Sequence, residues 1–294
     1  MQFILLIGLI VFGFVLTRVG WLRSGAVTWG NRYVIYVALP VVALAKVPGL
    51  QMEMDLLVLV ATPLLILLGA VLVFQVFLKS YFDNSERLVL TLTSGLGNTS
   101  FVGFPLIVFY FGADNLSYGA LFDQMTFLMM ASVGQAMIVK NSGVGLLGVI
   151  KRIVTFPVFL TVVIAFFIPD GLYPDWLVVS FDWVIYSLSV VAMIIIGYLI
   201  ATHVNLRIPP SALAGLGYKL VVAPALAFVV LLFIDLSADN LRAVSILEAS
   251  MAPQTSICLM LLENNKLPYL VSQILCWGTI ISLLTSFFWM MVVA

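Results

Sequence analysis

The chain has 294 residues, of which 63% are hydrophobic and only 9% are charged, and its mean hydropathy is +1.21. Soluble domains average about 45–50% apolar and about 25% charged residues, so this composition excludes an ordinary soluble protein. The formal charge is zero and no basic tract occurs, so nucleic acid is not an expected partner. Cys258 and Cys276 both lie in apolar runs, which indicates no disulfide framework.

Long apolar runs recur along the whole chain and predict an all-α polytopic membrane protein. A spanning helix needs about 20 apolar residues and satisfies its own backbone hydrogen bonds. The first run has no basic segment before it, as a cleavable signal peptide would, and we expect it to be a span. The runs predict ten spans, at residues 2–20, 31–49, 55–78, 86–111, 115–139, 149–169, 178–201, 210–234, 239–262 and 267–293.

The basic residues alternate from loop to loop, which orients the predicted spans. The loops after spans 1, 3, 5, 7 and 9 carry Arg18, Arg23, Arg32, Lys79, Arg87, Lys140, Lys151, Arg152, Arg207 and Lys266. The other loops carry only Lys46 and Arg242. Cytoplasmic loops are enriched in Lys and Arg, so both termini are expected outside the membrane.

Short sequences in the first half of the chain recur in the second half. "VIYVAL" at 34–39 returns as "VIYSLS" at 184–189, and "GNTS" at 97–100 returns as "PQTS" at 253–256, 156 residues later. Five spans per half is an odd number, so the second copy enters the membrane the other way up. The pattern predicts an inverted repeat, with residues 1–148 and 149–294 as its two halves, as in secondary transporters.

Two of the predicted spans are interrupted at corresponding points. Span 4 contains "SGLGNTSFVGFP" at 94–105, and span 9 contains "EASMAPQTSIC" at 248–258. Glycine supplies flexibility and proline removes an amide donor, so both helices are expected to break. Paired broken helices in the two halves indicate a transporter's binding site. The candidate substrate-binding residues are Gly97, Asn98, Thr99, Ser100, Pro105, Pro253, Gln254, Thr255 and Ser256.

The chemistry of these breaks suits a small anion. Freed amides at a half-helix N-terminus attract negative charge, and neutral side chains can bind a carboxylate and release it again. The alternative is that the small residues only let neighbouring helices pack closely.

The motifs resemble those of the auxin efflux carrier family. "GNTSFVGFPL" is similar to that family's fourth-span motif, in which Asn-Thr is followed by Gly-x-Pro, and "MAPQ" is similar to its ninth-span element. The resemblance covers nearly the whole chain. It implies the fold of bile-acid, arsenite and riboflavin type transporters, in which the two broken helices cross. Spans 1, 2, 6 and 7 would form a scaffold that carries a homodimer contact, and spans 3–5 and 8–10 a transport domain that moves like an elevator.

The chain departs from the plant members of that family. It lacks their long central loop, and Gly97 replaces the proline before Asn-Thr. The small bacterial members resemble it more, which implies a bacterial inner membrane and a cargo such as malate or malonate rather than auxin.

Two acidic residues and one lysine lie deep in the predicted spans. Asp123 is in span 5, Glu248 in span 9 and Lys219 in span 8. A charge at that depth costs at least about 2.5–3.5 kcal/mol, so each must face a partner or a cavity, or be neutralised. We interpret them as candidates for coupling transport to H⁺ or Na⁺. The alternatives for the acids are a structural ion pair or a carboxyl group hydrogen-bonded to a neighbouring helix. Lys219 is interpreted as the counter-ion or as a group that attracts an anion, and the alternative is a side chain that reaches the cytoplasmic surface.

No motif indicates an enzyme or a cofactor. The sequence has no metal-ligand spacing, and "GNTSFVG" is not a nucleophile elbow. The sequence therefore predicts a secondary transporter of a small organic anion. The alternatives are a ligand-binding membrane sensor that kept the transporter fold and a facilitative channel.

Overall fold

The computed structural model describes residues 2–48, 54–138, 155–169, 171–203, 205, 207–236 and 239–293. Every regular element in these ranges is helical, which confirms the all-α class. The boundary expected between the two repeats, at residues 148 and 149, lies outside the described residues, as do Lys140, Lys151 and Arg152.

The first half of the chain contains short 3-10 and π segments, labelled η, between its α-helices. Its elements are α1 (Gln2–Arg18), α2 (Ser24–Tyr33), η1 (Val34–Ala38), α3 (Leu39–Lys46), η2 (Met54–Leu56), α4 (Leu57–Val71), η3 (Leu72–Phe77), α5 (Asn84–Gly95), η4 (Thr99–Gly103), α6 (Phe104–Phe111), η5 (Ala113–Asn115), α7 (Leu116–Met129), η6 (Met130–Gly134) and α8 (Gln135–Ile138). Asp83 starts α5 with a capping box, because its carboxylate accepts from two backbone amides while Glu86 accepts from the Asp83 amide.

The second half has longer helices at two places. Its elements are α10 (Pro157–Ala165), α11 (Asp175–His203), α12 (Pro210–Gly217), η7 (Tyr218–Val222), α13 (Ala223–Leu232), α14 (Asp239–Ala249), α15 (Thr255–Glu263) and α16 (Pro268–Val293). Proline occupies the first turn of α10 and α12, where its missing amide leaves no bond unmade. Pro224 lies where α13 continues from η7, and the Trp289 side chain donates to the Leu220 carbonyl that it leaves without a helical donor.

Five helical stretches in the described residues are long and apolar enough to cross a membrane. They are Ser24–Lys46, Met54–Phe77, Asp175–His203, Pro210–Leu232 and Pro268–Val293. The second predicted span begins earlier than expected, at Ser24 rather than residue 31. Hydropathy locates the apolar part of a span, whereas backbone hydrogen bonds continue the helix into its polar first turns. The count of ten spans stays a prediction.

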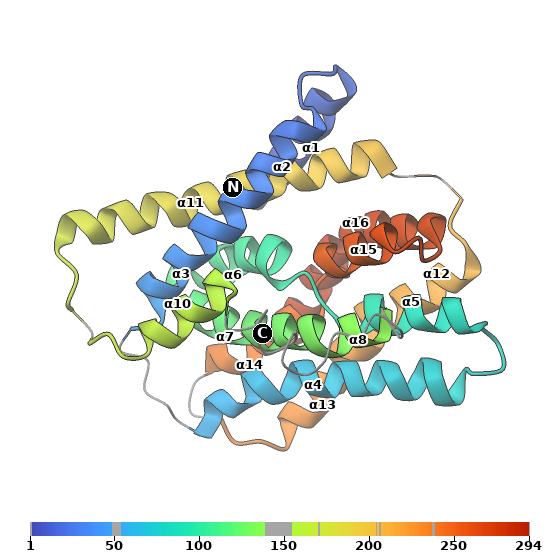
Figure 1. Ribbon diagram of the computed structural model, residues 1–294. Coiled ribbons are helices and arrows are strands. Elements are labelled where there is room, and N and C mark those ends of the chain that lie inside the picture. The colour runs from blue at the N-terminus through green and yellow to red at the C-terminus, as the bar shows by residue number, and fades with distance from the viewer. Residues whose placement is uncertain are drawn as a thin grey trace.

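Helices α1 and α11 pack along one edge of the molecule, and α4 and α13 lie toward the opposite edge (Figure 1). The α1–α11 contact is backbone to backbone. A Cβ on Gly13 would lie 2.3 Å from the Ile194 carbonyl oxygen, and a Cβ on Gly197 would lie 2.1 Å from the Ile10 carbonyl oxygen. Small residues permit this close approach of membrane helices, which fixes α1 against α11.

The buried apolar residues form two clusters. One cluster draws, among the described residues, only on α4, α5, α7, α8, α12–α16 and the η segments between them. The other joins α1, η1, α3, α10 and α11 to η4, α6 and parts of α4, α7, α13, α14 and α16. The helices of predicted spans 3–5 and 8–10 therefore share a core in which predicted spans 1, 2, 6 and 7 take no described part.

Candidate functional site

The two interrupted helices break at the predicted positions, and the breaks touch. Helix α5 ends at Gly95 and α14 ends at Ala249, and a short non-helical segment follows each. Gly97 and Pro253 form an isolated antiparallel bridge. The same two positions head the aligned sequences "GNTS" and "PQTS".

The backbone bonds between the breaks are related by the repeat. The Asn98 amide donates to the Ala252 carbonyl at 2.7 Å, and the Gln254 amide donates to the Leu96 carbonyl at 3.0 Å. A shift of 156 residues, with the two halves exchanged, converts one bond into the other. Each break thus satisfies an amide and a carbonyl that its own helix leaves unpaired, as a membrane interior requires.

Side chains add one direct link across this contact. The Asn98 side-chain amide donates to the Thr255 hydroxyl at 2.9 Å, and both residues are buried. Gln254 is also buried, and its side-chain oxygen has no hydrogen-bond partner among the described residues. Ser256 is half-buried in the first turn of α15. The breaks therefore bring together most of the predicted binding residues, with Gln254 left able to accept a bond.

Asp123, on α7, lies beside the first break. Its carboxylate accepts hydrogen bonds from the hydroxyls of Thr99 and Ser100, and its side chain is buried. Two predicted binding residues therefore hold a predicted coupling residue. An ionised carboxylate is purely an acceptor, so two donating hydroxyls suit its charged form.

Glu248, in the last turn of α14, is the opposite case. It is completely buried, and neither carboxylate oxygen has a hydrogen-bond partner among the described residues. Asp123 and Lys219 are the charged groups that act on it electrostatically. An ionised carboxylate without hydrogen bonds is costly in an apolar interior.

Two glycines make the space that Glu248 occupies. A Cβ on Gly103 would lie 2.2 Å from one Glu248 carboxylate oxygen, and a Cβ on Gly119 would lie 3.4 Å from the other. Gly103 has ordinary helical dihedral angles, φ −64° and ψ −52°, so flexibility is not its role, contrary to the expectation from sequence. Sequence reasoning missed Gly119, because nothing in its local pattern points to a residue 129 positions away.

Lys219 lies between the two breaks. Its ammonium donates to the Ala249 carbonyl at 3.1 Å, and a Cβ on Gly97 would lie 3.0 Å from its Nζ. The side chain is only 1% exposed, so it does not reach the cytoplasmic surface, and that alternative is wrong. Its π-helical segment, η7, belongs to a class of helix irregularity that is frequent at functional sites.

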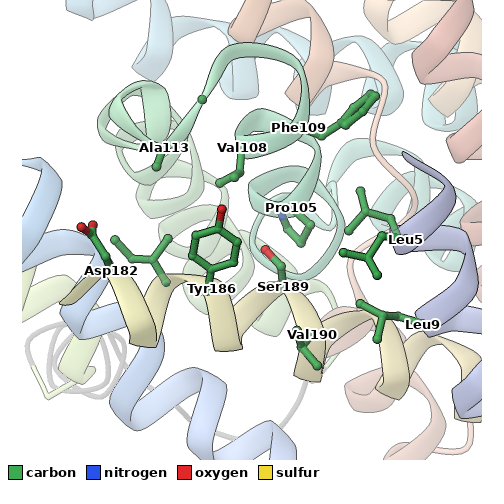
Figure 2. Close-up of a pocket in the computed structure, with 13 residues that line it drawn as sticks. Leu5, Leu9, Pro105, Val108, Phe109, Ala113, Asp182, Tyr186, Ser189 and Val190 are labelled. Carbon is green, nitrogen blue, oxygen red and sulfur yellow. The ribbon is translucent and has the colours of Figure 1, made fainter. Parts of the chain in front are cut away.

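Pro105 lies away from the contact of the breaks. It lines a mostly apolar cavity of about 240 Å³ between α6, α1 and α11, which we call the α6 cavity. Figure 2 shows Tyr186 and Ser189 of α11 facing Val108 and Pro105 of α6, with Leu5 and Leu9 of α1 beside them. The full lining is Leu5, Leu6, Leu9, Pro105, Val108, Phe109, Gly112, Ala113, Asp182, Ile185, Tyr186, Ser189 and Val190.

A second cavity, of about 730 Å³, lies at the start of α5, and we call it the α5 cavity. Its described lining is Gln75, Asn84, Ser85, Arg87, Leu88, Val133, Ala136, Met137, Ile138 and Lys266. Two cations thus line it, Arg87 and Lys266. The α5 and α6 cavities lie along the two halves of the same broken helix, on either side of its break.

The described residues contain no group of three or more His, Cys, Asp or Glu side chains that could hold a metal ion. The buried charges around the breaks are instead two acids and one amine, Asp123, Glu248 and Lys219. Such a set can exchange protons or attract an ion but has no evident nucleophile with an adjacent base.

The chain is similar in sequence to membrane transport proteins. Residues 1–150 match the model of a family described as membrane transport protein. The chain is also 25% identical over 296 residues to an uncharacterized transporter of Methanothermobacter thermautotrophicus, covering 97% of this chain and 95% of that relative.

Proposed function

Because this chain belongs to the auxin efflux carrier family of membrane transport proteins, we propose that it is a secondary active carrier of a small organic anion. Transport across a membrane is the family's activity, and the family is not enzymatic. The proposed cargo is a carboxylate of the malate or malonate kind, and the proposed location is a bacterial inner membrane with both termini outside.

The contact of the two breaks is the observation that carries this proposal. Shifting residues by the repeat offset converts one of the two backbone hydrogen bonds between the breaks into the other. Two inverted halves that meet at a common axis require this relation. This geometry supports ten spans in a five-plus-five inverted repeat with broken helices that cross. Transporters of that architecture bind cargo where the half-helix ends meet, near the middle of the membrane.

The division of the core supports an elevator movement. The cluster shared by predicted spans 3–5 and 8–10 suits a body that moves as a unit. The glycine contact between α1 and α11 suits a rigid scaffold, which we propose also carries the homodimer contact. The α6 cavity lies between α6 of the first body and α1 and α11 of the second, where sliding would change the packing.

Charge distribution supports an anionic cargo. Arg87 and Lys266 line the α5 cavity. We propose that this cavity faces the cytoplasm, because cytoplasmic loops are enriched in Lys and Arg. Cations that line a cavity concentrate anions in it. At the breaks, Gln254, Thr255 and Ser256 offer neutral groups that can replace the water around a carboxylate without holding it permanently.

Uptake into proteoliposomes tests the proposal. Purified protein is reconstituted, and entry of radiolabelled malate and malonate is measured under imposed pH and Na⁺ gradients. We expect saturable uptake. We expect Asn98→Ala and Pro253→Ala each to lower it by about tenfold or more, because each removes a group at the contact of the breaks.

Matched controls are an asparagine and a proline outside the breaks. Asn264→Ala removes an exposed side chain that bonds only within its own turn, and Pro268→Ala changes the exposed first residue of α16. Both are expected to transport normally. Wild-type uptake in Asn98→Ala and Pro253→Ala would remove the site from the breaks. Saturable binding without uptake would favour a sensor, and uptake that does not saturate would favour a channel.

A further inference from the structure

Lys219 holds the position where a transporter of this architecture can bind a metal cation. Unwound carbonyls and the C-terminal ends of half-helices coordinate Na⁺ in such proteins, because both carry partial negative charge. Ala249 is the last residue of α14, and its carbonyl accepts from the Lys219 ammonium at 3.1 Å. A positive charge therefore already lies at this half-helix end.

The same ammonium also reaches the first break. A Cβ on Gly97 would lie 3.0 Å from Lys219 Nζ, so the amine packs directly against the bridge between Gly97 and Pro253. Lys219 is 1% exposed and cannot swing into water without a change in the surrounding helices. A second cation placed beside it would meet like-charge repulsion in a medium of low dielectric constant.

One bound proton would balance the charges of the buried groups around Lys219. Glu248 is the buried acid that acts electrostatically on Lys219, and Asp123 acts in turn on Glu248. With both acids ionised, the three groups sum to one negative charge. Thr99 and Ser100 donate to Asp123, which suits its ionised form. Glu248 receives no hydrogen bond from any described residue. A proton on Glu248 makes the cluster neutral.

On the described elements that pack against α14, no further charged side chain competes for this role. The elements packed against α14 are α4, η4, α6, α7, α13 and α16. Of these, α4, η4, α6, α13 and α16 contain no Asp, Glu, Lys, Arg or His, and α7 contributes Asp123 alone. Tyr110, Tyr118, Tyr269 and Cys276 are the weaker titratable groups on these elements.

We infer that Lys219 is a tethered cation that takes the place of a bound metal ion at the contact of the breaks, and that the coupling ion is H⁺, carried by Glu248. The inference rests on the proposed transport function. In the step, the Glu248 carboxylate takes a proton from water on one side of the membrane, forming a carboxylic acid. It returns that proton to water on the other side.

A stability measurement tests the cation role without any cargo. The melting temperature of purified protein in detergent is compared between NaCl and choline chloride of equal concentration. We expect no difference for the wild type. We expect Na⁺ to raise the melting temperature of Lys219→Ala, because the vacated carbonyl can now accept a cation. Lys79→Ala, which removes an exposed lysine, is the control and is expected to behave as wild type.

Malate uptake tests the proton role. We expect wild-type uptake to follow a pH gradient and to be indifferent to Na⁺, and Glu248→Gln to lose its dependence on pH with binding of malate retained. Wild-type protein stabilised by Na⁺, or wild-type uptake driven by a Na⁺ gradient, would overturn the inference. Glu248→Gln with unchanged pH dependence would do the same.

The design separates this inference from the proposed function. Failure of Lys219→Ala to fold leaves the wild-type comparison of NaCl and choline chloride decisive. A wild type that carries no carboxylate under any gradient contradicts the proposed function, whereas uptake that depends on Na⁺ contradicts only the inference.

Discussion

The two breaks make the same backbone hydrogen bonds but are flanked by different side chains. Each donates one amide and accepts with one carbonyl, through bonds that exchange when the two halves are exchanged. The first break is flanked by Asp123, whose carboxylate is held by two hydroxyls. The second is flanked by Glu248, whose carboxylate has no described partner, and by Lys219 on the adjacent carbonyl.

The two halves therefore share a backbone arrangement but differ in the side chains around it. Backbone bonds between the halves need no particular side chain, so they persist while the flanking residues diverge. Asp123, Glu248 and Lys219 have no matching partner set at the other break, so the chemistry at the two breaks differs although their backbone bonds match.

The largest loss of stability is expected when a larger side chain is placed against the second break. A Cβ on Gly278 would lie 2.5 Å from Pro253 Cδ and 3.0 Å from Leu216 Cδ2. We expect Gly278→Leu to destabilise the protein by about 1–3 kcal/mol or to prevent folding, because the added side chain overlaps Pro253 and forces α16 and the second break apart. Thermal unfolding in detergent and the monodisperse fraction measure this.

The matched control is Gly217→Leu in α12, where an added Cβ would meet nothing within 4 Å. We expect it to fold normally. Equal stability of the two variants would mean that the second break can shift to accommodate the larger side chain. The contact of the breaks would then not be a rigid part of the structure.

The next effect concerns the space around Glu248. A Cβ on Gly103 would lie 2.2 Å from its carboxylate, which has to move. We expect Gly103→Ala to fold, because the contacted atom ends a flexible side chain, but to lose malate uptake by about tenfold. Gly217→Ala is the control. Normal uptake and pH dependence in Gly103→Ala would show that the position of the Glu248 carboxylate does not matter.

Gly103 also shows where sequence reasoning ends. The sequence located both breaks and aligned the residues that touch, because glycine, proline and the "GNTS" and "PQTS" echo are local patterns. It did not reveal that Gly103 makes room for Glu248, because that depends on which faces of η4 and α14 meet. Long-range packing of this kind leaves no local pattern in either segment.

The same limit explains the other differences. The sequence allows two interpretations of Lys219, a counter-ion or a side chain that reaches the surface. Only its 1% exposure in the folded protein excludes the second. Pro105 was grouped with the break because it lies in the same motif, yet it lines the α6 cavity seven residues beyond Asn98. Hydropathy misplaced the start of α2, because a helix continues into polar residues beyond the apolar run.

A smaller effect is expected from the donors to Asp123. Thr99→Ala and Ser100→Ala together remove both hydroxyl bonds to this carboxylate. Hydrogen bonds to charged groups contribute about 1.5–3 kcal/mol to stability, so we expect a lower melting temperature. We expect a several-fold loss of uptake to accompany it. Thr93→Ala, which removes a buried hydroxyl bonded within its own helix, is the control. An effect no larger than the control's would mean that Asp123 needs neither donor.

The smallest effect is expected from the side-chain bond across the breaks. Thr255→Ala removes the acceptor of the Asn98 side chain, at 2.9 Å, and leaves both backbone bonds intact. Side-chain hydrogen bonds between membrane helices average about 0.6 kcal/mol, so a double-mutant cycle of Asn98→Ala and Thr255→Ala should give a coupling of about that size. Thr279→Ala, whose hydroxyl bonds within α16, supplies the control. A coupling of several kcal/mol would mean that side chains, not the shared backbone bonds, hold the breaks together. The contact of the breaks would then depend on Asn98, which is glutamine at the corresponding position of the other half, and not on the backbone that the halves share.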